Sequence, residues 1–194
     1  MADPISIGIS SMALFVSATT LWFTLLRQGR LAMTKPTIVF FGYEGNAPYL
    51  KPKIFLRTLL YSTSIRGKII EGMYLKLKRG GNEKVFSFWG YGEREKLVPG
   101  SGLYVGQTGI AANHHFVIAM DDNTYKFEAG DYIIQVFARL VGKKAPLQLS
   151  TIQISFLEEH ASVLSQRNGM YGVVFELGPD NQGYIGHINE RPYA

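Results

Sequence analysis

The chain has 194 residues and a formal net charge of +5, and it contains no cysteine. The lack of cysteine argues against a disulfide-stapled extracellular module and against a zinc site built on thiolates. The length allows one domain with its own core after an N-terminal segment.

The first element is an apolar run of 22 residues, Ile5 to Leu26, that holds no charged residue. As a helix it would reach about 33 Å, enough to cross a hydrocarbon core of about 30 Å. A cleaved signal peptide carries Lys or Arg before its apolar run, whereas here Met-Ala-Asp-Pro precedes the run. We therefore expect residues 1–26 to be a retained transmembrane anchor. A signal peptide and a helix buried in a soluble core are the alternatives.

Basic residues follow the anchor at Arg27, Arg30 and Lys35. The positive-inside rule then keeps this flank in the cytoplasm and sends the short N-terminus across the membrane. We expect residues 27–36 to be a basic tether that ends at Pro36. The predicted localisation is a single-pass membrane protein with its N-terminus outside and its folded domain in the cytoplasm.

Small residues recur along the anchor at steps of three and four, at Ser6, Ser10, Ala13, Ser17, Thr20 and Thr24. This spacing puts them on one stripe of a helix. Transmembrane helices associate through close packing of small residues, so the stripe predicts a helix-packing interface. The alternative is that the hydroxyls bond back to carbonyls of their own helix and need no partner.

Beyond the anchor, apolar residues alternate as they do in strands. The expected strands are 38–41, 53–63, 69–79, 85–89, 113–120, 128–136 and 147–156. Gly80, Gly81 and Asn82 supply a hairpin turn. Residues 90–109 are rich in glycine, and we expect them to form an irregular exposed connection.

The segment Glu128 to Val136 resembles the tyrosine corner of immunoglobulin-like sandwiches, in which an early strand tyrosine bonds back to the preceding turn. Tyr132 would be that structural tyrosine. The resemblance implies that residues 37–157 form a mainly β, antiparallel, immunoglobulin-like β-sandwich, and it implies nothing about function.

Residues 158–194 are expected to add a helix and a β-hairpin. Ser155 and Glu158 have the spacing of a capping box, and the helix should stop near Asn168 and Gly169. The hairpin strands would be 171–177 and 184–188.

No arrangement of residues indicates a catalytic, cofactor-binding or metal-binding site. Adjacent residues of a strand face opposite ways, so His114 and His115 should not share an ion. We expect one half-buried and three surface histidines. The acidic residues Asp121, Asp122, Glu128 and Asp131 lack the spacing of a calcium loop, and no nucleophile elbow or phosphate loop is present.

One basic patch surrounds the predicted hairpin, at Lys76, Lys78, Arg79 and Lys84. Anionic lipid headgroups are a candidate partner, because a domain beside the cytoplasmic leaflet is attracted by it. A solvated face without a partner is the alternative. Nucleic acid is not expected.

The sequence therefore predicts a non-catalytic, single-pass, membrane-anchored interaction protein, an accessory or scaffolding subunit of a larger membrane complex. Its partners would be other transmembrane helices. Two alternatives remain. One is a membrane-tethered enzyme or small-ligand binder that uses loop 90–109 near His114 and His115, and the other is an externally displayed adhesin-like module.

Overall fold

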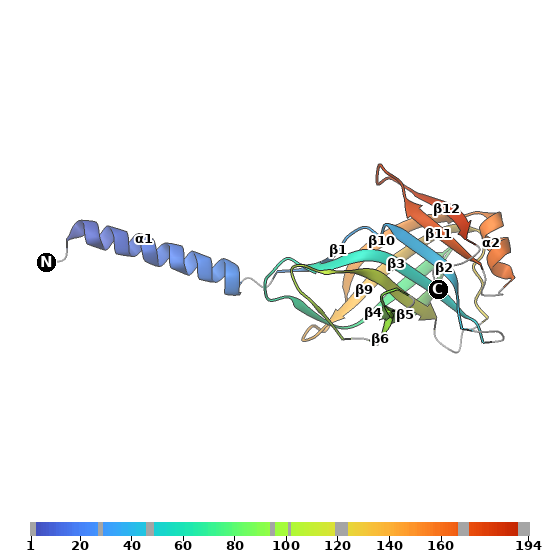
Figure 1. Ribbon diagram of the computed structural model, residues 1–194, viewed down its shortest axis with the longest axis horizontal. Helices are drawn as coiled ribbons and strands as arrows, with labels where there is room; N and C mark the ends of the chain where they lie inside the picture. Colours follow the sequence, from blue (N-terminus) through green and yellow to red (C-terminus); the bar gives the residue numbers. More distant parts are fainter. Residues whose placement is uncertain are drawn as a thin grey trace.

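The computed structural model describes residues 3–26, 29–45, 49–93, 96–100, 102–118, 124–166 and 171–189. It consists of one N-terminal helix that projects from a β domain (Figure 1). The helix is α1 (Pro4–Leu21), and it continues into a short π-helical turn, η1 (Trp22–Leu26). Asp3 caps its start by accepting a hydrogen bond from the Ile5 N–H at 3.2 Å, and Pro4 occupies the first turn, where no N–H is needed.

The β domain is built on one antiparallel sheet, in the order β10-β9-β4-β5-β8-β3-β2-β11-β12. The strands are β1 (Leu31–Met33), β2 (Ile38–Glu44), β3 (Lys51–Ser62), β4 (Lys68–Arg79), β5 (Asn82–Tyr91), β6 (Val98–Pro99), β7 (Leu103–Val105), β8 (Ile110–Ile118), β9 (Gly130–Leu140), β10 (Leu147–Phe156), β11 (Gly172–Leu177) and β12 (Tyr184–Asn189). The short strands β1, β6 and β7 pair with β3, β5 and β4. Each expected strand has a counterpart, although β9 begins two residues later than expected and residues 119 and 120 of the expected strand 113–120 lie outside the described residues. Loop 90–109 contributes β6 and β7.

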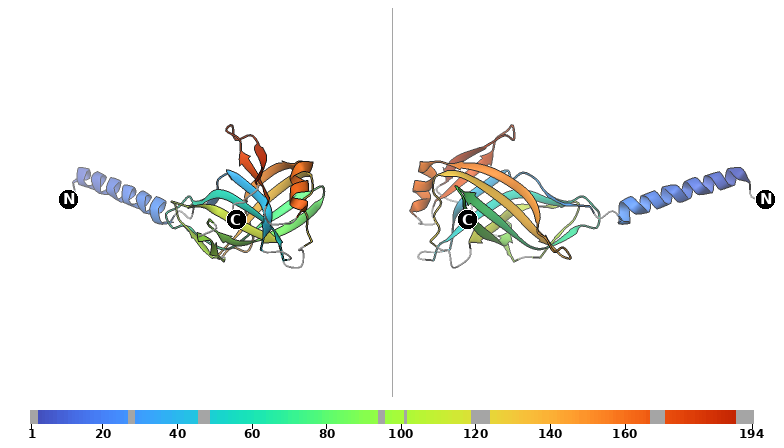
Figure 2. Two further views of the ribbon diagram at one scale, coloured as in Figure 1. Left: turned by 45° about the vertical axis from the view of Figure 1, so that its right-hand side comes forward. Right: turned by 180° about the vertical axis from the view of Figure 1, so that it is seen from behind.

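The sheet curls until it is nearly a barrel (Figure 2). At the end next to the anchor, β1 extends the line of β2 along β3 and lies beside β10. At the other end, α2 (Glu158–Ser165) lies beside β11 and β12. The mainly β, antiparallel prediction is confirmed. The immunoglobulin-like sandwich is not, because the described strands form one curled sheet instead of two stacked ones.

The two ends of the barrel are defined by the strand connections. β3 ends at Ser62, which pairs with Leu31 at the start of the domain. The following turn, residues 63–67, is therefore at the end next to α1, which we call the helix-proximal end. β4 runs away from it, and the turn between β4 and β5 lies at the opposite end, the far end.

The core lies inside the barrel and is largely aromatic. On β9, Tyr132, Ile134 and Val136 are buried while Ile133 faces outward, the alternation expected of a strand with one buried face. Phe41 makes edge contacts with Phe127, Phe156 and Phe175 at centroid distances of 5.3, 5.0 and 5.7 Å. Each such side chain contributes about 1.5–3 kcal/mol by leaving water.

The prediction that residues 27–36 form a tether is wrong for residues 29–36, the part of this range that the structure describes. Residues 31–33 form β1, and the Thr34 hydroxyl accepts the Leu59 N–H at 3.0 Å. Backbone groups there pair with β3 because a strand edge is available beside them. The C-terminal helix and hairpin are likewise not an appendage, since β11 pairs with β2 in the same sheet.

The predicted helix after residue 157 is confirmed, but its predicted capping box is wrong. The expected stop at Asn168 and Gly169 lies outside the described residues. Ser155 lies within β10, and its hydroxyl donates to Asp131 Oδ1 at 2.6 Å. Leu157 is the N-cap, and its N–H donates to His160 Nδ1 at 3.2 Å. The helix therefore begins two residues later than the capping pattern implied.

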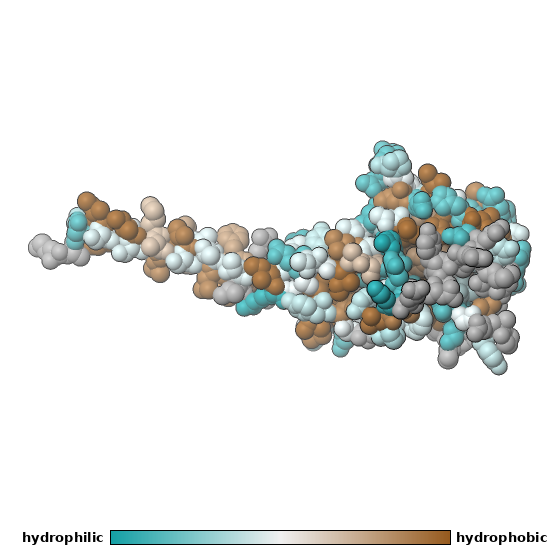
Figure 3. All heavy atoms as spheres, in the orientation of Figure 1, coloured by the Kyte–Doolittle hydropathy of each residue, from teal (hydrophilic) through white to brown (hydrophobic). Residues whose placement is uncertain are grey.

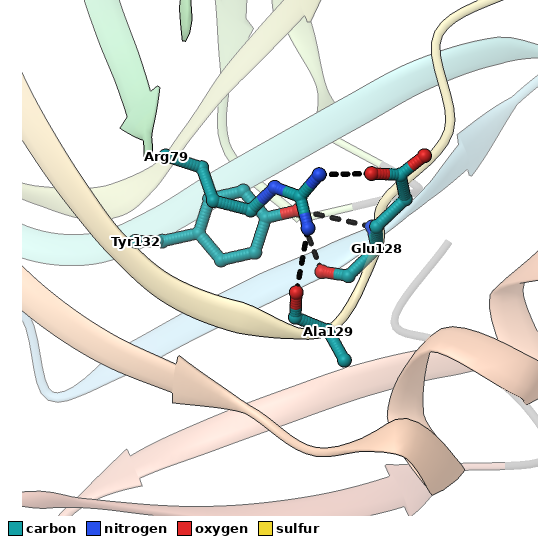
Figure 4. Close-up of polar contacts among 4 residues, drawn as sticks. All are labelled: Arg79, Glu128, Ala129 and Tyr132. Atoms are coloured by element: carbon teal, nitrogen blue, oxygen red, sulfur yellow. Dashed lines mark hydrogen bonds and ion pairs between the residues drawn. The ribbon is translucent and has the colours of Figure 1, made fainter. Parts of the chain in front are cut away.

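Tyr132 makes the hydrogen bonds of a tyrosine corner (Figure 4). Its hydroxyl donates to the Glu128 carbonyl at 2.8 Å and accepts the Glu128 N–H at 3.0 Å. Arg79 completes the corner by donating to the Ala129 carbonyl at 2.6 Å and pairing with the Glu128 carboxylate. The motif therefore occurs here without the sandwich, because it needs only a turn that folds back on its own strand.

Replacing Tyr132 with Phe should lower the free energy of unfolding by about 1–3 kcal/mol, because two backbone groups at Glu128 lose their partner. Urea unfolding of the full chain in detergent, followed by near-UV circular dichroism, measures it. Tyr49→Phe is the matched control, since Tyr49 is 77% exposed. Equal midpoints for the two variants would show that the corner does not stabilise the domain.

Candidate functional site

The predicted helix-packing stripe lies on one side of α1. At about 100° per residue, Ser6 to Thr20 of the stripe fall within an arc of roughly 80°. The hydroxyls of Ser10, Thr20 and Thr24 donate to the carbonyls of Ser6, Val16 and Thr20 at 2.8, 2.8 and 2.7 Å. These three hydroxyls are thus satisfied within their own helix, as the alternative interpretation stated. What remains in favour of an interface is the small size of the side chains.

The basic flank of the anchor is held by the barrel. Arg27 lies outside the described residues. The Arg30 N–H donates to Thr63 Oγ1 at 2.7 Å, which leaves its guanidinium exposed. Lys35 Nζ donates to the Asn181 carbonyl at 2.5 Å and lies 5.7 Å from the Tyr184 ring centre, so this lysine is engaged by the C-terminal hairpin.

The predicted basic patch on the β4–β5 hairpin is largely neutralised by acidic partners. Lys76 and Lys78 lie 2.7 and 3.3 Å from the Glu83 carboxylate. The hydrogen bond from Lys76 lowers the pKa of Glu83. Arg79 is committed to the tyrosine corner (Figure 4), and Lys84 Nζ lies 6.0 Å from the ring centre of Tyr125.

The position of this patch also argues against contact with lipid. β4 carries 12 residues, which is about 40 Å of strand, between the helix-proximal end and the hairpin. The hairpin is therefore at the end of the domain away from α1 (Figure 1). Sequence reasoning missed this because strand direction relative to the anchor depends on the connections of the whole sheet.

A surface groove of about 430 Å³ runs between this hairpin and the segment that leads into β9. Its lining residues are Leu77, Arg79, Asn82, Glu83, Lys84, Thr124, Tyr125, Lys126 and Glu128. Three basic and two acidic side chains leave it nearly balanced in charge. It is thus a weak candidate for an anion site.

His114 and His115 lie in β8 and contact different sets of residues, as predicted from the strand period. His114 is fully buried inside the barrel beside Phe88 and Tyr91, with ring centres 6.2 and 6.5 Å away. Neither of its ring nitrogens makes a hydrogen bond of normal geometry with a described residue. His115 Nε2 lies 2.9 Å from the Gly92 carbonyl.

The expectation of mostly exposed histidines is wrong, since His114, His115 and His160 are all buried. Burial lowers the pKa of His114 and of His115 to about 4. Both rings are therefore neutral at neutral pH. A group with so low a pKa is poorly matched to acid–base catalysis near pH 7.

A polar cluster that sequence reasoning missed surrounds His115 on the outer face of the barrel. Lys53 is only 3% exposed; it pairs with the Glu44 carboxylate and lies 5.6 Å from the Trp89 ring centre. The sequence contains only part of the information needed to predict this cluster. The β2–β3 hairpin brings Glu44 and Lys53 together, but the hairpin does not show that Lys53 is buried. The ion pair compensates the cost of burying that ammonium group.

Among the described residues, no group of three or more His, Asp or Glu side chains could hold a metal ion. Asp121 and Asp122 lie outside the described residues. Glu128 pairs with Arg79, and Asp131 accepts a hydrogen bond from Ser155. The two described members of the acidic group thus have structural partners.

The buried histidines predict a pH-dependent stability. The folded pKa of His114, about 4, lies below the ordinary value of 6.5, so the unfolded chain binds more protons between these values. The stability that neutral His114 contributes is complete above pH 6.5 and is lost as the pH falls toward 4. The loss amounts to about 2 kcal/mol at pH 5. Urea midpoints of the wild type and His114→Leu at pH 7 and pH 5 test this. A variant with the same pH dependence as the wild type would contradict it.

Comparison with protein-family models, with curated proteins and with solved structures finds no match to this chain. The function proposed below therefore rests on the sequence and on the geometry described above.

Proposed function

We propose that this chain is a non-catalytic, single-pass membrane protein that holds a β domain at the cytoplasmic membrane surface as an accessory or scaffolding subunit of a larger complex. The observation that carries the proposal is the complete exposure of an apolar helix. The span Pro4–Thr24 is long and apolar enough to cross a membrane, and none of it is buried against the rest of the chain.

Figure 3 shows apolar side chains along the length of α1. Met12, Leu14 and Phe15 are each 70% exposed or more. Burying an apolar side chain of this size is worth about 1.5–3 kcal/mol, so water is an unfavourable surrounding for the helix. A bilayer supplies apolar contact around the whole circumference, which fits a helix that carries no charged side chain on any face.

The β domain supports an interaction role over catalysis. Its interior is filled by aromatic and aliphatic side chains, and the charged groups that we describe are paired or exposed. One observation favours the second candidate, a small-ligand binder: loop 90–109 does reach His115 through the Gly92 carbonyl. That contact occupies the ring nitrogen, however, so we place this candidate second.

The proposed orientation predicts that protease added to intact cells leaves the β domain uncut, whereas permeabilised cells lose it. The reason is that Arg30 and its basic neighbours keep this flank on the cytoplasmic side. An epitope tag after residue 166, followed by immunoblotting, reports both cases. Digestion in intact cells would instead support the externally displayed, adhesin-like alternative.

The proposed helix interface predicts that Ala13→Leu combined with Ser17→Leu separates α1 from its partner helix without impairing insertion. Loss of close packing should weaken the association by more than the about 0.6 kcal/mol that one interhelical hydrogen bond contributes on average. Co-purification from a mild detergent extract measures the association, and carbonate extraction measures insertion.

The control is Ser11→Leu combined with Ala18→Leu, which makes the same change in composition. At about 100° per residue these positions lie roughly 120–140° from the centre of the stripe. Equal co-purification of the two double variants would place the attachment outside the stripe.

A further inference from the structure

The helix-proximal end of the barrel is tied closely to the end of the anchor. Leu26 and Gly29 are three residues apart, so their Cα atoms are within about 11 Å whatever the tilt of the helix. Arg30 and Thr63 exchange two hydrogen bonds, Arg30 N–H to Thr63 Oγ1 at 2.7 Å and Thr63 N–H to the Arg30 carbonyl at 2.9 Å. Gly29 has φ +54°, and a Cβ there would lie 2.6 Å from Ser64 Cβ. Such a close approach fixes Gly29 against the turn at residues 63–67.

Four segments meet at this end, and we call them the rim: residues 29–33, 62–70, 102–109 and 139–147. They are joined to one another by hydrogen bonds. The Ser62 N–H donates to the Gly106 carbonyl at 3.0 Å, and the Val141 N–H donates to the Ile69 carbonyl at 3.1 Å. The Tyr104 hydroxyl donates to the Arg66 carbonyl at 3.3 Å. The rim is therefore one connected surface.

The rim is strongly basic, and the exposed Glu71 lies just outside it, in the β-bulge opposite Leu140 and Arg139. Its basic residues are Arg30, Arg66, Lys68, Arg139, Lys143 and Lys144, and no Asp or Glu occurs in the four segments. None of the six forms an ion pair with a described residue, in contrast to the hairpin patch at the far end. The six basic residues of the rim contribute a formal charge of +6. The whole chain carries +5, so the formal charges of all other residues sum to −1.

The same surface exposes apolar side chains. Ile65, Ile69, Tyr104 and Val141 are 60%, 52%, 60% and 58% exposed. Aliphatic side chains, a tyrosine and unpaired basic groups together are typical of protein surfaces that sit in the headgroup region of a bilayer. Anionic lipids add an attraction for each nearby Lys or Arg.

We infer that the rim is an interfacial surface that binds anionic phospholipids and holds the barrel upright against the membrane. The inference rests on the proposed function, because it requires α1 to lie in the bilayer. It assigns the lipid contact to residues other than the β4–β5 hairpin, and it fits a cytoplasmic leaflet, which is the anionic one.

The full chain contains no cysteine, so one introduced cysteine can carry a single bimane label. The labelled variants are Val141→Cys on the rim and, as a control, Tyr49→Cys at the far end. Each labelled protein is reconstituted in nanodiscs of phosphatidylcholine alone or mixed with phosphatidylserine, and quenching by a lipid with a nitroxide headgroup is measured. Quenching at Val141 should exceed that at Tyr49 by about threefold in the anionic discs and should weaken in 1 M salt.

Charge reversal tests the electrostatic part. Lys143→Glu combined with Lys144→Glu should remove the dependence on phosphatidylserine. Both lysines are exposed in a turn, so folding should persist. Lys51→Glu combined with Lys126→Glu, at the far end, makes the same change in net charge and should leave the quenching unchanged.

The outcomes separate the two proposals. A chain that does not enter the discs contradicts the proposed membrane anchor. A chain that enters the discs but shows equal quenching at Val141 and Tyr49 contradicts the rim contact alone. Quenching that is the same with and without phosphatidylserine overturns the binding of anionic lipid, and an acidic protein surface would then be the partner to seek.

Discussion

The junction between α1 and the barrel decides which end of the barrel lies next to the apolar helix. The pairing of β1 with β3, together with the two hydrogen bonds between Arg30 and Thr63, brings the domain to the end of the apolar helix. A ten-residue flexible tether would have let the barrel sample many orientations, and no particular surface would then face the bilayer. In the proposed orientation, the end of the barrel that bears Arg66 and Tyr104 would therefore lie beside the membrane. The helix and the rim would then bind the membrane together.

Aromatic packing and a hydrogen-bonded tyrosine corner stabilise the barrel. The ring contacts around Phe41 fill its centre, and the Tyr132 corner fixes the entry to β9. His114 is an exception, since it is a polar ring among aromatic neighbours. Burial lowers its pKa, so the ring stays neutral. On the outer face, the buried Lys53 depends on Glu44 for its charge to be tolerated.

Several errors of sequence reasoning have a common cause. Segments such as 69–79 and 147–156 were recognisable as strands because the alternation of side chains is local information. Whether those strands build two sheets or one curled sheet depends on pairings between distant segments, such as β9 with β4 and β2 with β11. The Tyr132 motif reports only its own turn, and so it occurs in a barrel-like sheet as it does in a sandwich. The burial of His115 and Lys53 was missed for the same reason, because strand alternation alone assigns their face to solvent.

The sequence by itself determined the apolar helix, the mainly β character, most strand positions and the terminal hairpin, because these follow from short-range periodicity, turn residues and the length of an uncharged run. It did not determine where charge would be unpaired. Lys76 and Arg79 look like a free basic patch in the sequence, yet cross-strand neighbours and the corner neutralise them. The six basic residues of the rim are scattered over more than a hundred positions, and only the closure of the sheet gathers them at the end next to the anchor. Tertiary structure decided this because antiparallel connections return distant turns to the same end.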